Sequence, residues 1–120
     1  MKKRILVVDD DIDIRSILEF ILLQEDFEPI LMHIGPSIED IFSLQPDLIL
    51  LDVMIDGFRK SGSDICAEFK SNAAIAKIPI LLVSAEHHLD LLAKSCNADG
   101  FIPKPFDIED LVNKVKEFLS

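Results

Sequence analysis

The sequence predicts an α/β protein with a doubly wound, five-stranded parallel sheet. Short apolar runs alternate with longer amphipathic segments five times along the chain. The apolar runs are continuous, which is typical of strands covered on both faces, as in parallel sheets. Helices between such strands form right-handed crossovers and cover both faces of the sheet. For five strands the common order is 2-1-3-4-5, the flavodoxin-like (βα)5 arrangement.

The five predicted strands are runs of aliphatic or aromatic residues bounded by turn-forming residues. They span residues 5–8, 27–32, 48–51, 78–83 and 101–102. Because Pro29 lacks an amide hydrogen, we expect the second strand at an edge of the sheet, or Pro29 near the start of that strand. Pro79 stands at the start of the fourth strand, and Pro103 and Pro105 interrupt the chain after the fifth.

The five predicted helices are marked by apolar residues at helical spacing. These stripes are Ile14, Ile17, Leu18, Ile21 and Leu22; Ile38, Ile41 and Phe42; Ile65, Cys66 and Phe69; Leu89, Leu91, Leu92 and Cys96; and Ile108, Leu111, Val112, Val115 and Leu119. We expect the last two stripes to be part of the core. The first helix ends near Gln24, and Pro46 closes the second. Asn97 tolerates the left-handed position after the fourth helix, and Asp107 is expected to cap the fifth.

Length and composition predict a single domain over residues 1–120. A hydrophobic content of 49% excludes a disordered acidic tail. The net charge of -10 argues against a nucleic-acid-binding surface and against binding to anionic membranes. The first apolar run ends at Asp9, unlike a secretory signal, and no run approaches the roughly 18 apolar residues of a membrane span. Cys66 and Cys96 are expected to be reduced and mostly buried, so we expect a cytoplasmic protein.

Polar residues follow four of the predicted strands. Asp9–Asp11 follow the first strand, Asp52 the third, Ser84-Ala85 the fourth and Lys104 the fifth. In such sheets, ligands bind beyond the carboxyl ends of the strands, where the strand order reverses. In the order 2-1-3-4-5 these four strands are neighbours. We therefore expect carboxylates, a hydroxyl and an ammonium group to meet at one rim of the sheet.

The carboxylates at this rim indicate a cation. Two carboxylates about 5 Å apart repel by roughly 3 kcal/mol at an effective dielectric constant near 20. Asp9, Asp10 and Asp52 therefore predict either raised pKa values or a bound cation, for which Mg²⁺ or Mn²⁺ suits oxygen ligands better than zinc. Lys104 and the Ser84 hydroxyl are groups that bind phosphoryl oxygens. Together these groups describe a phosphoryl site in which an aspartate can be the nucleophile.

Four segments of the chain resemble the receiver domain of two-component response regulators, in particular chemotaxis-type receivers. They are Ile5-Leu6-Val7-Val8-Asp9-Asp10-Asp11, Pro46-Asp47-Leu48-Ile49-Leu50-Leu51-Asp52-Val53-Met54, Leu82-Val83-Ser84-Ala85 and Lys104-Pro105-Phe106. The resemblance covers essentially the whole chain. It implies that Asp52 is the phosphoacceptor, that Asp10, Asp52 and the Met54 backbone carbonyl bind Mg²⁺, and that Asp9 contacts the metal through water.

The resemblance also assigns a switch. It implies that Lys104 contacts the phosphoryl group, that its bond to Pro105 is cis, and that Ala85 leaves access for the phosphoryl group. Ser84 would move to bond that group, and Phe101 would swing inward when the Ser84 hydroxyl moves. Ordinary packing in the core is the alternative role for Phe101.

The implied function is phosphorelay signalling, not turnover of an external substrate. A sensor histidine kinase or phosphotransfer protein would phosphorylate Asp52, and the surface of the fourth helix, fifth strand and fifth helix would then bind an effector or output domain. A homodimer formed on phosphorylation is compatible with the resemblance. Two alternatives remain: a receiver fold that acts as a scaffold without cycling, and an aspartyl phosphatase. The phosphatase reading lacks its usual second Asp, because Met54 occupies that place.

The chain departs from the family pattern after Asp52. Asp56 stands where Pro is common, and the run from Phe58 to Gly62 is longer than usual. The positions of Met54 and Glu86 influence the hydrolysis rate in the family. The other polar residues are interpreted structurally: Asp11 and Asp13 as stabilising the start of the first helix, and His33, His87 and His88 as surface or capping residues.

Overall fold

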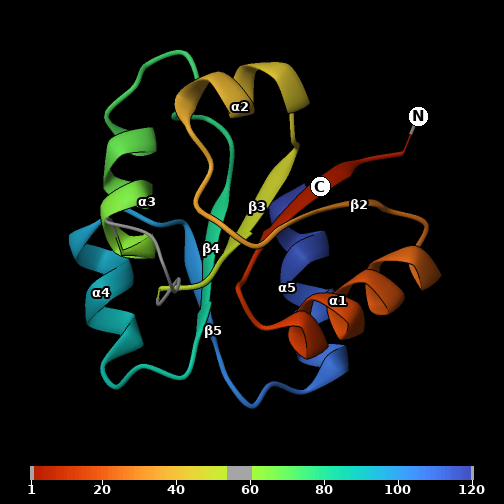
Figure 1. Cartoon of the computed structure of the whole chain (residues 1–120). Coiled ribbons are helices and arrows are strands. Elements are labelled where there is room, and N and C mark those ends of the chain that lie inside the picture. Colours follow the sequence, from red (N-terminus) through yellow and green to blue (C-terminus); the bar gives the residue numbers. More distant parts are fainter. Residues whose placement is uncertain (1, 54–60, 120) are drawn as a thin grey trace.

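The computed structural model describes residues 2–53 and 61–119. Strands and helices alternate along the chain, and each strand is followed by a helix (Figure 1). The strands are β1 Arg4–Val8, β2 Glu28–Met32, β3 Leu48–Leu51, β4 Ile80–Ser84 and β5 Gly100–Pro103. The helices are α1 Ile12–Gln24, α2 Ile38–Leu44, α3 Gly62–Lys70, α4 Leu89–Ser95 and α5 Ile108–Leu119.

The strands form a parallel sheet in the order β2-β1-β3-β4-β5, which confirms the predicted topology. Strand β1 pairs with β2 on one side and β3 on the other, so that Leu6 is opposite Ile30 and Ile49. β2 is an edge strand, as expected from Pro29. After β1 the chain moves to one side of the sheet and from β3 onward to the other. The carboxyl ends of β1 and β3 therefore flank the switch point of the fold.

Helices α1 and α5 cover one face of the sheet, and α2, α3 and α4 cover the other (Figure 1). Successive side chains of a strand point to opposite faces, so each strand contributes to both layers. In β1, Ile5 and Val7 belong to the core cluster with α1 and α5, whereas Leu6 and Val8 belong to the other cluster. Burial on both faces explains why the strand sequences are continuously apolar.

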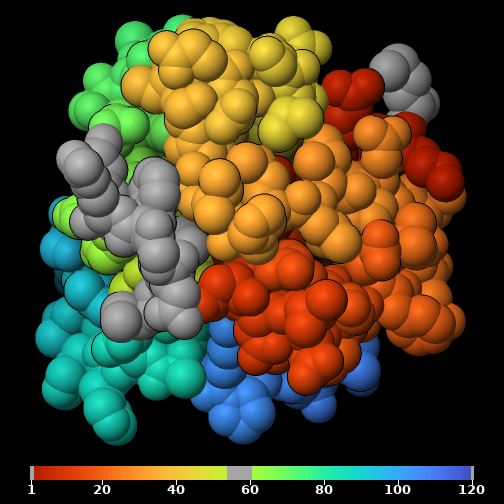
Figure 2. All heavy atoms as spheres, viewed as in Figure 1, coloured from red at the N-terminus to blue at the C-terminus, as the bar shows by residue number. Residues whose placement is uncertain are grey.

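Two residues of the stripes that we expected in the core, Leu91 and Ile108, are 59% and 57% exposed, which corrects the prediction for them. In two other stripes, Ile17 and Phe42 are 46% and 51% exposed. A helix that packs on a sheet buries only its inner face, so residues at the edge of the stripe contact water. On α1, Ile17 and the exposed Phe20 give the helix an apolar outer side, and this helix lies at the front of the space-filling view (Figure 2).

Polar residues, not apolar spacing, set the start of α3. The helix begins at Gly62, whereas the apolar pattern begins at Ile65. The Ser61 hydroxyl accepts a hydrogen bond from the Asp64 amide at 3.2 Å, and the Asp64 carboxylate accepts one from the Ser61 amide at 3.3 Å. This reciprocal capping box satisfies amides at the start of the helix that have no partner inside it.

The capping residues that we singled out adopt the expected roles. Asp11 caps α1 by accepting hydrogen bonds from the amides of Asp13 at 2.9 Å and Ile14 at 3.4 Å. Asn97 follows α4 with a φ of 62°, in the left-handed region. The Asp107 carboxylate accepts a hydrogen bond from an amide in the first turn of α5 at 3.1 Å.

The two cysteines are free thiols and both are buried, as predicted. The Cys66 thiol donates to the backbone carbonyl of Cys96 at 3.5 Å, which joins α3 to the end of α4. Burial, followed by the neighbouring Cys96, raises the pKa of the Cys66 thiol far above its ordinary value. Cys66 is therefore a protonated packing residue at neutral pH.

One ammonium group links three segments next to β4. Lys70 Nζ lies 2.6 Å from an Asp99 carboxylate oxygen and donates at 2.9 Å to the carbonyls of Ala76 and Ile78. The same Asp99 oxygen accepts a hydrogen bond from the Ile80 amide at 2.8 Å. The strand itself begins at Ile80, two residues later than predicted, and the Ile78 carbonyl before it bonds Lys70.

We predict that Lys70→Met destabilises the protein by about 2–3 kcal/mol. The substitution keeps the apolar stem but removes a buried cation, and the cost of breaking a buried pair is roughly 3–5 kcal/mol, lowered here because Asp99 is partly exposed. Urea unfolding measures the change. The matched control is Lys116→Met, which breaks the exposed pair with Glu25 and should cost less than about 1 kcal/mol. Equal costs for the two variants would contradict the role of Lys70.

Candidate functional site

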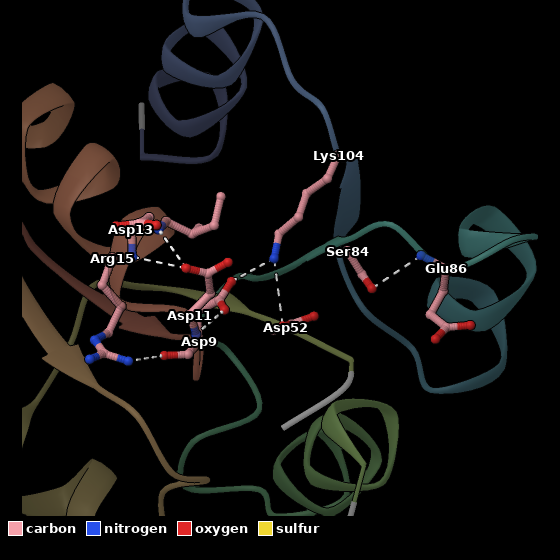
Figure 3. Close-up of polar contacts among 9 residues, drawn as sticks. Asp9, Asp11, Asp13, Arg15, Asp52, Ser84, Glu86 and Lys104 are labelled. Atoms are coloured by element: carbon pink, nitrogen blue, oxygen red, sulfur yellow. Dashed lines mark hydrogen bonds and ion pairs between the residues drawn. The ribbon is translucent and has the colours of Figure 1, made fainter. Parts of the chain in front are cut away.

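The predicted site residues meet at the carboxyl ends of four neighbouring strands (Figure 3). Asp9 follows β1, Asp52 follows β3, Ser84 ends β4, and Lys104 follows β5. The backbone extends the sheet ladder to this rim, because the Asp52 amide donates to a β1 carbonyl and the Lys104 amide donates to the Ser84 carbonyl, each at 2.9 Å. Sheet topology therefore brings together residues that are far apart in the sequence.

The loop after β1 is fixed by its own polar contacts. The Asp9 carboxylate is 2% exposed and accepts a hydrogen bond from the Asp11 amide at 3.0 Å. The Asp9 amide donates to the Met32 carbonyl of β2 at 3.1 Å. From α1, an Arg15 guanidinium nitrogen donates to the Asp9 carbonyl at 2.7 Å (Figure 3). This role of Arg15 could not be predicted from the sequence, because no motif distinguishes a guanidinium that bonds a backbone carbonyl.

Lys104 lies between two carboxylates. Its Nζ is 2.7 Å from an Asp9 oxygen and 3.6 Å from an Asp52 oxygen (Figure 3). Burial alone would lower the pKa of Lys104, but the Asp9 hydrogen bond and the charges of Asp52 and Asp9 outweigh burial, and the pKa is raised above its ordinary value. A raised pKa stabilises the fold at all pH values below the ordinary value, and this stabilisation is lost only as the pH rises through the folded value. Lys104 is thus a cation at neutral pH.

Three carboxylates converge beside this cation. Asp9, Asp10 and Asp52 each have an oxygen within 4.8 Å of the others, and both Asp9 and Asp52 are buried. At that separation two carboxylates repel by about 3 kcal/mol at an effective dielectric constant near 20. One lysine offsets only part of three negative charges. The all-oxygen donor set fits a hard divalent cation such as Mg²⁺, which keeps several water ligands.

A pocket of about 310 Å³ opens above Asp52. Its lining residues are Asp52, Ser84, Ala85, Glu86, His87 and Lys104. The Ser84 hydroxyl accepts a hydrogen bond from the Glu86 amide at 3.3 Å (Figure 3). His87, which we predicted to be a surface or capping residue, is exposed and also lines this pocket. The capping position of α4 belongs to His88, whose φ is 58°.

Phe101 lies on the edge strand β5. Its side chain is half-buried and packs against the core cluster that contains residues of α2, α3 and α4. Both predicted roles, core packing and switching, are compatible with this position. The bond between Lys104 and Pro105 is cis, as expected. The expected metal ligand Met54 and the unusual residues Asp56 to Lys60 lie outside the described residues.

Gly62 is a required glycine at the site, because the first turn of α3 touches the backbone of Asp52. A Cβ atom on Gly62 would overlap the carbonyl oxygen of Asp52 and would lie 2.7 Å from its carbonyl carbon and 2.8 Å from Val53 Cα. The Gly62 amide also donates to the Val53 carbonyl at 2.6 Å. The position of the Asp52 backbone thus depends on the absence of a side chain at Gly62.

We predict that Gly62→Ala lowers the free energy of unfolding by about 3 kcal/mol or more, because the clash is with backbone atoms, which cannot turn away. Gly100→Ala is the control: its Cβ would meet only side-chain atoms of Leu81 and Phe118, at 3.0 Å and beyond. We expect a cost of about 1 kcal/mol for that control. Urea unfolding of both variants is the measurement, and a smaller effect at Gly62 than at Gly100 would refute the close approach.

Comparison with known proteins identifies the family. The family model of the response regulator receiver domain matches residues 5–116, so the chain belongs to this family. Receiver domains serve phosphorelay signalling as regulatory phosphoacceptor domains, and they bind Mg²⁺ at an acidic pocket. The fold is accordingly that of chemotaxis-type receivers, with the strand order described above.

Solved structures agree with the family. The receiver domain of NtrX from Brucella abortus is 31% identical, with a TM-score of 0.84 over 96% of this chain and 97% of that one. A CheY-like receiver domain protein from Methanospirillum hungatei is 26% identical, with a TM-score of 0.85 over 99% and 94%. A longer NtrX structure matches at 30% identity and a TM-score of 0.85, but the chain covers only 28% of it. Within the described ranges, no helix is both long enough and apolar enough to span a membrane.

Proposed function

We propose that this chain is a phosphoacceptor switch in which Asp52 receives a phosphoryl group from a sensor histidine kinase or a phosphotransfer protein. The observation that carries the proposal is the position of Lys104, 2.7 Å from Asp9 and 3.6 Å from Asp52 at the edge of an open pocket. An ion pair with a purely structural role would not need an open pocket lined by the Asp52 carboxylate. We propose a single receiver domain over residues 1–120, located in the cytoplasm.

The proposed metal ligands are carboxylate oxygens of Asp10 and Asp52 and the backbone carbonyl of Met54, with Asp9 contacting the metal through water. Mg²⁺ is the expected ion, and Mn²⁺ has suitable ligand preferences. When bound, the ion would neutralise negative charge on the oxygens of the transferred phosphoryl group. The cluster of Asp9, Asp10 and Asp52 supports this assignment, because its oxygens lie within 4.8 Å of one another.

The residues of the chain perform the transfer as follows. An Asp52 carboxylate oxygen forms a bond to phosphorus while the bond from phosphorus to the donor histidine nitrogen breaks, and the imidazole retains the electron pair. Lys104 offers its ammonium hydrogens to a phosphoryl oxygen, at a site where Asp9 already orients it. Ala85 keeps the pocket open at its rim. Water later hydrolyses the acyl phosphate, so the chain catalyses only its own phosphorylation and dephosphorylation.

The proposed output is a change of surface. Ser84 leaves its hydrogen bond with the Glu86 amide to bond the phosphoryl group, and Phe101 turns inward into the space that is released. The surface of α4, β5 and α5 then binds an effector or an output domain, or a second copy of the chain. The alternative is a scaffold of the same fold that does not cycle. Failure to bind Mg²⁺ at millimolar concentrations would favour that alternative.

The test is intact-mass spectrometry after incubation with Mg²⁺ and a small acyl-phosphate donor. We expect one phosphoryl group per chain with Mg²⁺ and none when a chelator removes the metal. A receiver domain of known activity verifies the donor. Absence of labelling with Mg²⁺, while the control receiver is labelled, would overturn the proposal of a cycling switch.

A further inference from the structure

We propose that Lys114 is a positioning residue that holds Phe101 in its resting position, so that it sets how readily the switch responds. The inference rests on the proposed function, in which Phe101 changes position. Its basis is a contact of α5 with β5 that no part of the phosphoryl site requires. Lys114 Nζ lies 5.3 Å from the centre of the Phe101 ring and donates to the Phe101 backbone carbonyl at 3.3 Å.

The two contacts act on different parts of Phe101. The hydrogen bond to the carbonyl fixes where Lys114 Nζ lies relative to the strand, because β5 is an edge strand and its outer side offers backbone groups. With the nitrogen fixed, the ammonium charge lies above the ring face, where the negative charge of the π system attracts it. The ring therefore gains a favourable interaction in this one position, and loses it on turning.

The Phe101 ring borders open space next to Lys114. Phe101 and Lys114 line a pocket of about 350 Å³ between β5 and α5, together with Asp110, Asn113 and Glu117. The ring is only half-buried, whereas the neighbouring Ile102 is 4% exposed and belongs to the core cluster of α1 and α5. Packing thus covers Phe101 less completely than it covers Ile102, and the contact with Lys114 adds to what restrains the ring.

The observed position belongs to the resting state of the proposed switch. In this position the Ser84 hydroxyl accepts a hydrogen bond from the Glu86 amide at 3.3 Å, the contact that it would leave to bond a phosphoryl group (Figure 3). A contact made only in the resting state raises the proportion of that state, and a ligand that selects the other state must overcome the contact. Removal of the ammonium should therefore favour the switched state before any phosphorylation.

The test compares wild type with Lys114→Met, which keeps the stem, and Lys114→Arg, which keeps a cation. Beryllium trifluoride with Mg²⁺ is the probe, as a mimic of the phosphoryl group on Asp52. We expect Lys114→Met to raise the population of the alternative Phe101 ring environment, measured by NMR, by about two- to five-fold, the ratio that corresponds to a cation–π contact of ~0.5–1 kcal/mol. By linkage, the probe should bind tighter by the same factor. Lys114→Arg should retain both wild-type values.

Two further measurements distinguish a specific contact between Lys114 and the Phe101 ring from a general effect of removing a charge from α5. In wild type the methylene protons next to Lys114 Nζ should show an upfield ring-current shift that Phe101→Leu removes. Lys116→Met, on the same helix, should leave ring environment and probe affinity unchanged. Unchanged ring populations in Lys114→Met, or a ring-current shift that survives Phe101→Leu, would overturn the inference. If wild type fails to bind the probe, the proposed function fails, while the ring measurements still decide the role of Lys114.

Discussion

Asp52→Asn is expected to abolish phosphoryl labelling completely. The amide of Asn has nearly the shape of the carboxylate but lacks its negative charge, so it cannot serve as the nucleophile. The fold should persist, because the substitution removes one of three carboxylates whose oxygens lie within 4.8 Å of one another. We therefore expect the free energy of unfolding not to fall at neutral pH. Intact mass after incubation with Mg²⁺ and the acyl-phosphate donor measures labelling, and urea unfolding measures stability.

Asp90→Asn is the control for Asp52→Asn. Asp90 is an exposed residue in the first turn of α4 that does not line the pocket above Asp52, and its variant should be labelled like the wild type. If Asp52→Asn keeps a label that the control also carries, the phosphoryl group is attached elsewhere. That outcome would refute the assignment of Asp52 as the phosphoacceptor.

Lys104→Met is expected to slow phosphorylation by the small donor about 100-fold or more. The variant loses the ammonium that lies 2.7 Å from Asp9 and 3.6 Å from Asp52, and loss of one such preorganised group typically costs 10²–10³ in rate. Mg²⁺ binding should be at least as tight as in wild type, because the variant no longer holds a competing cation among the carboxylates. The opposite directions of the two effects separate contact with the phosphoryl group from metal binding.

The rate of labelling by mass spectrometry and a Mg²⁺ titration provide the two readouts for Lys104→Met. Lys94→Met is the control, since Lys94 is exposed on α4 and should leave both readouts at the wild-type level. A Lys104→Met variant that is labelled at the wild-type rate would exclude a role for this ammonium in phosphoryl transfer.

The topology and the composition of the site could be predicted because both depend on local sequence. Continuous apolar runs identify buried parallel strands, and the residues directly after these runs lie at one rim whatever the side chains in the helices are. Asp9, Asp52, Ser84 and Lys104 could therefore be placed together before any coordinates were considered. Their proximity in the structure confirms that placement, whereas their chemical roles stay predictions.

Other features could not be predicted because they depend on the path of loops in three dimensions. The Lys70 ammonium bonds two carbonyls and Asp99, and no spacing in the sequence distinguishes it from a solvated lysine. Arg15 bonds a backbone carbonyl, and Lys114 lies over an aromatic ring 13 residues earlier. Likewise, the exposed Phe42 has the same hydropathy as a buried phenylalanine. Its burial depends only on how wide a face of α2 contacts the sheet.

The ion pair between Lys104 and Asp9 joins residues that are 95 positions apart in the sequence. A chain still being synthesised has its aspartates long before it has this lysine, and β5 must pair with β4 before the lysine can reach them. The carboxylates of an incomplete chain therefore lack the tethered cation that the finished site contains. If Lys104 has the proposed role, efficient phosphorylation requires a completed sheet, and we expect truncated or half-folded copies to be phosphorylated much more slowly than the folded protein.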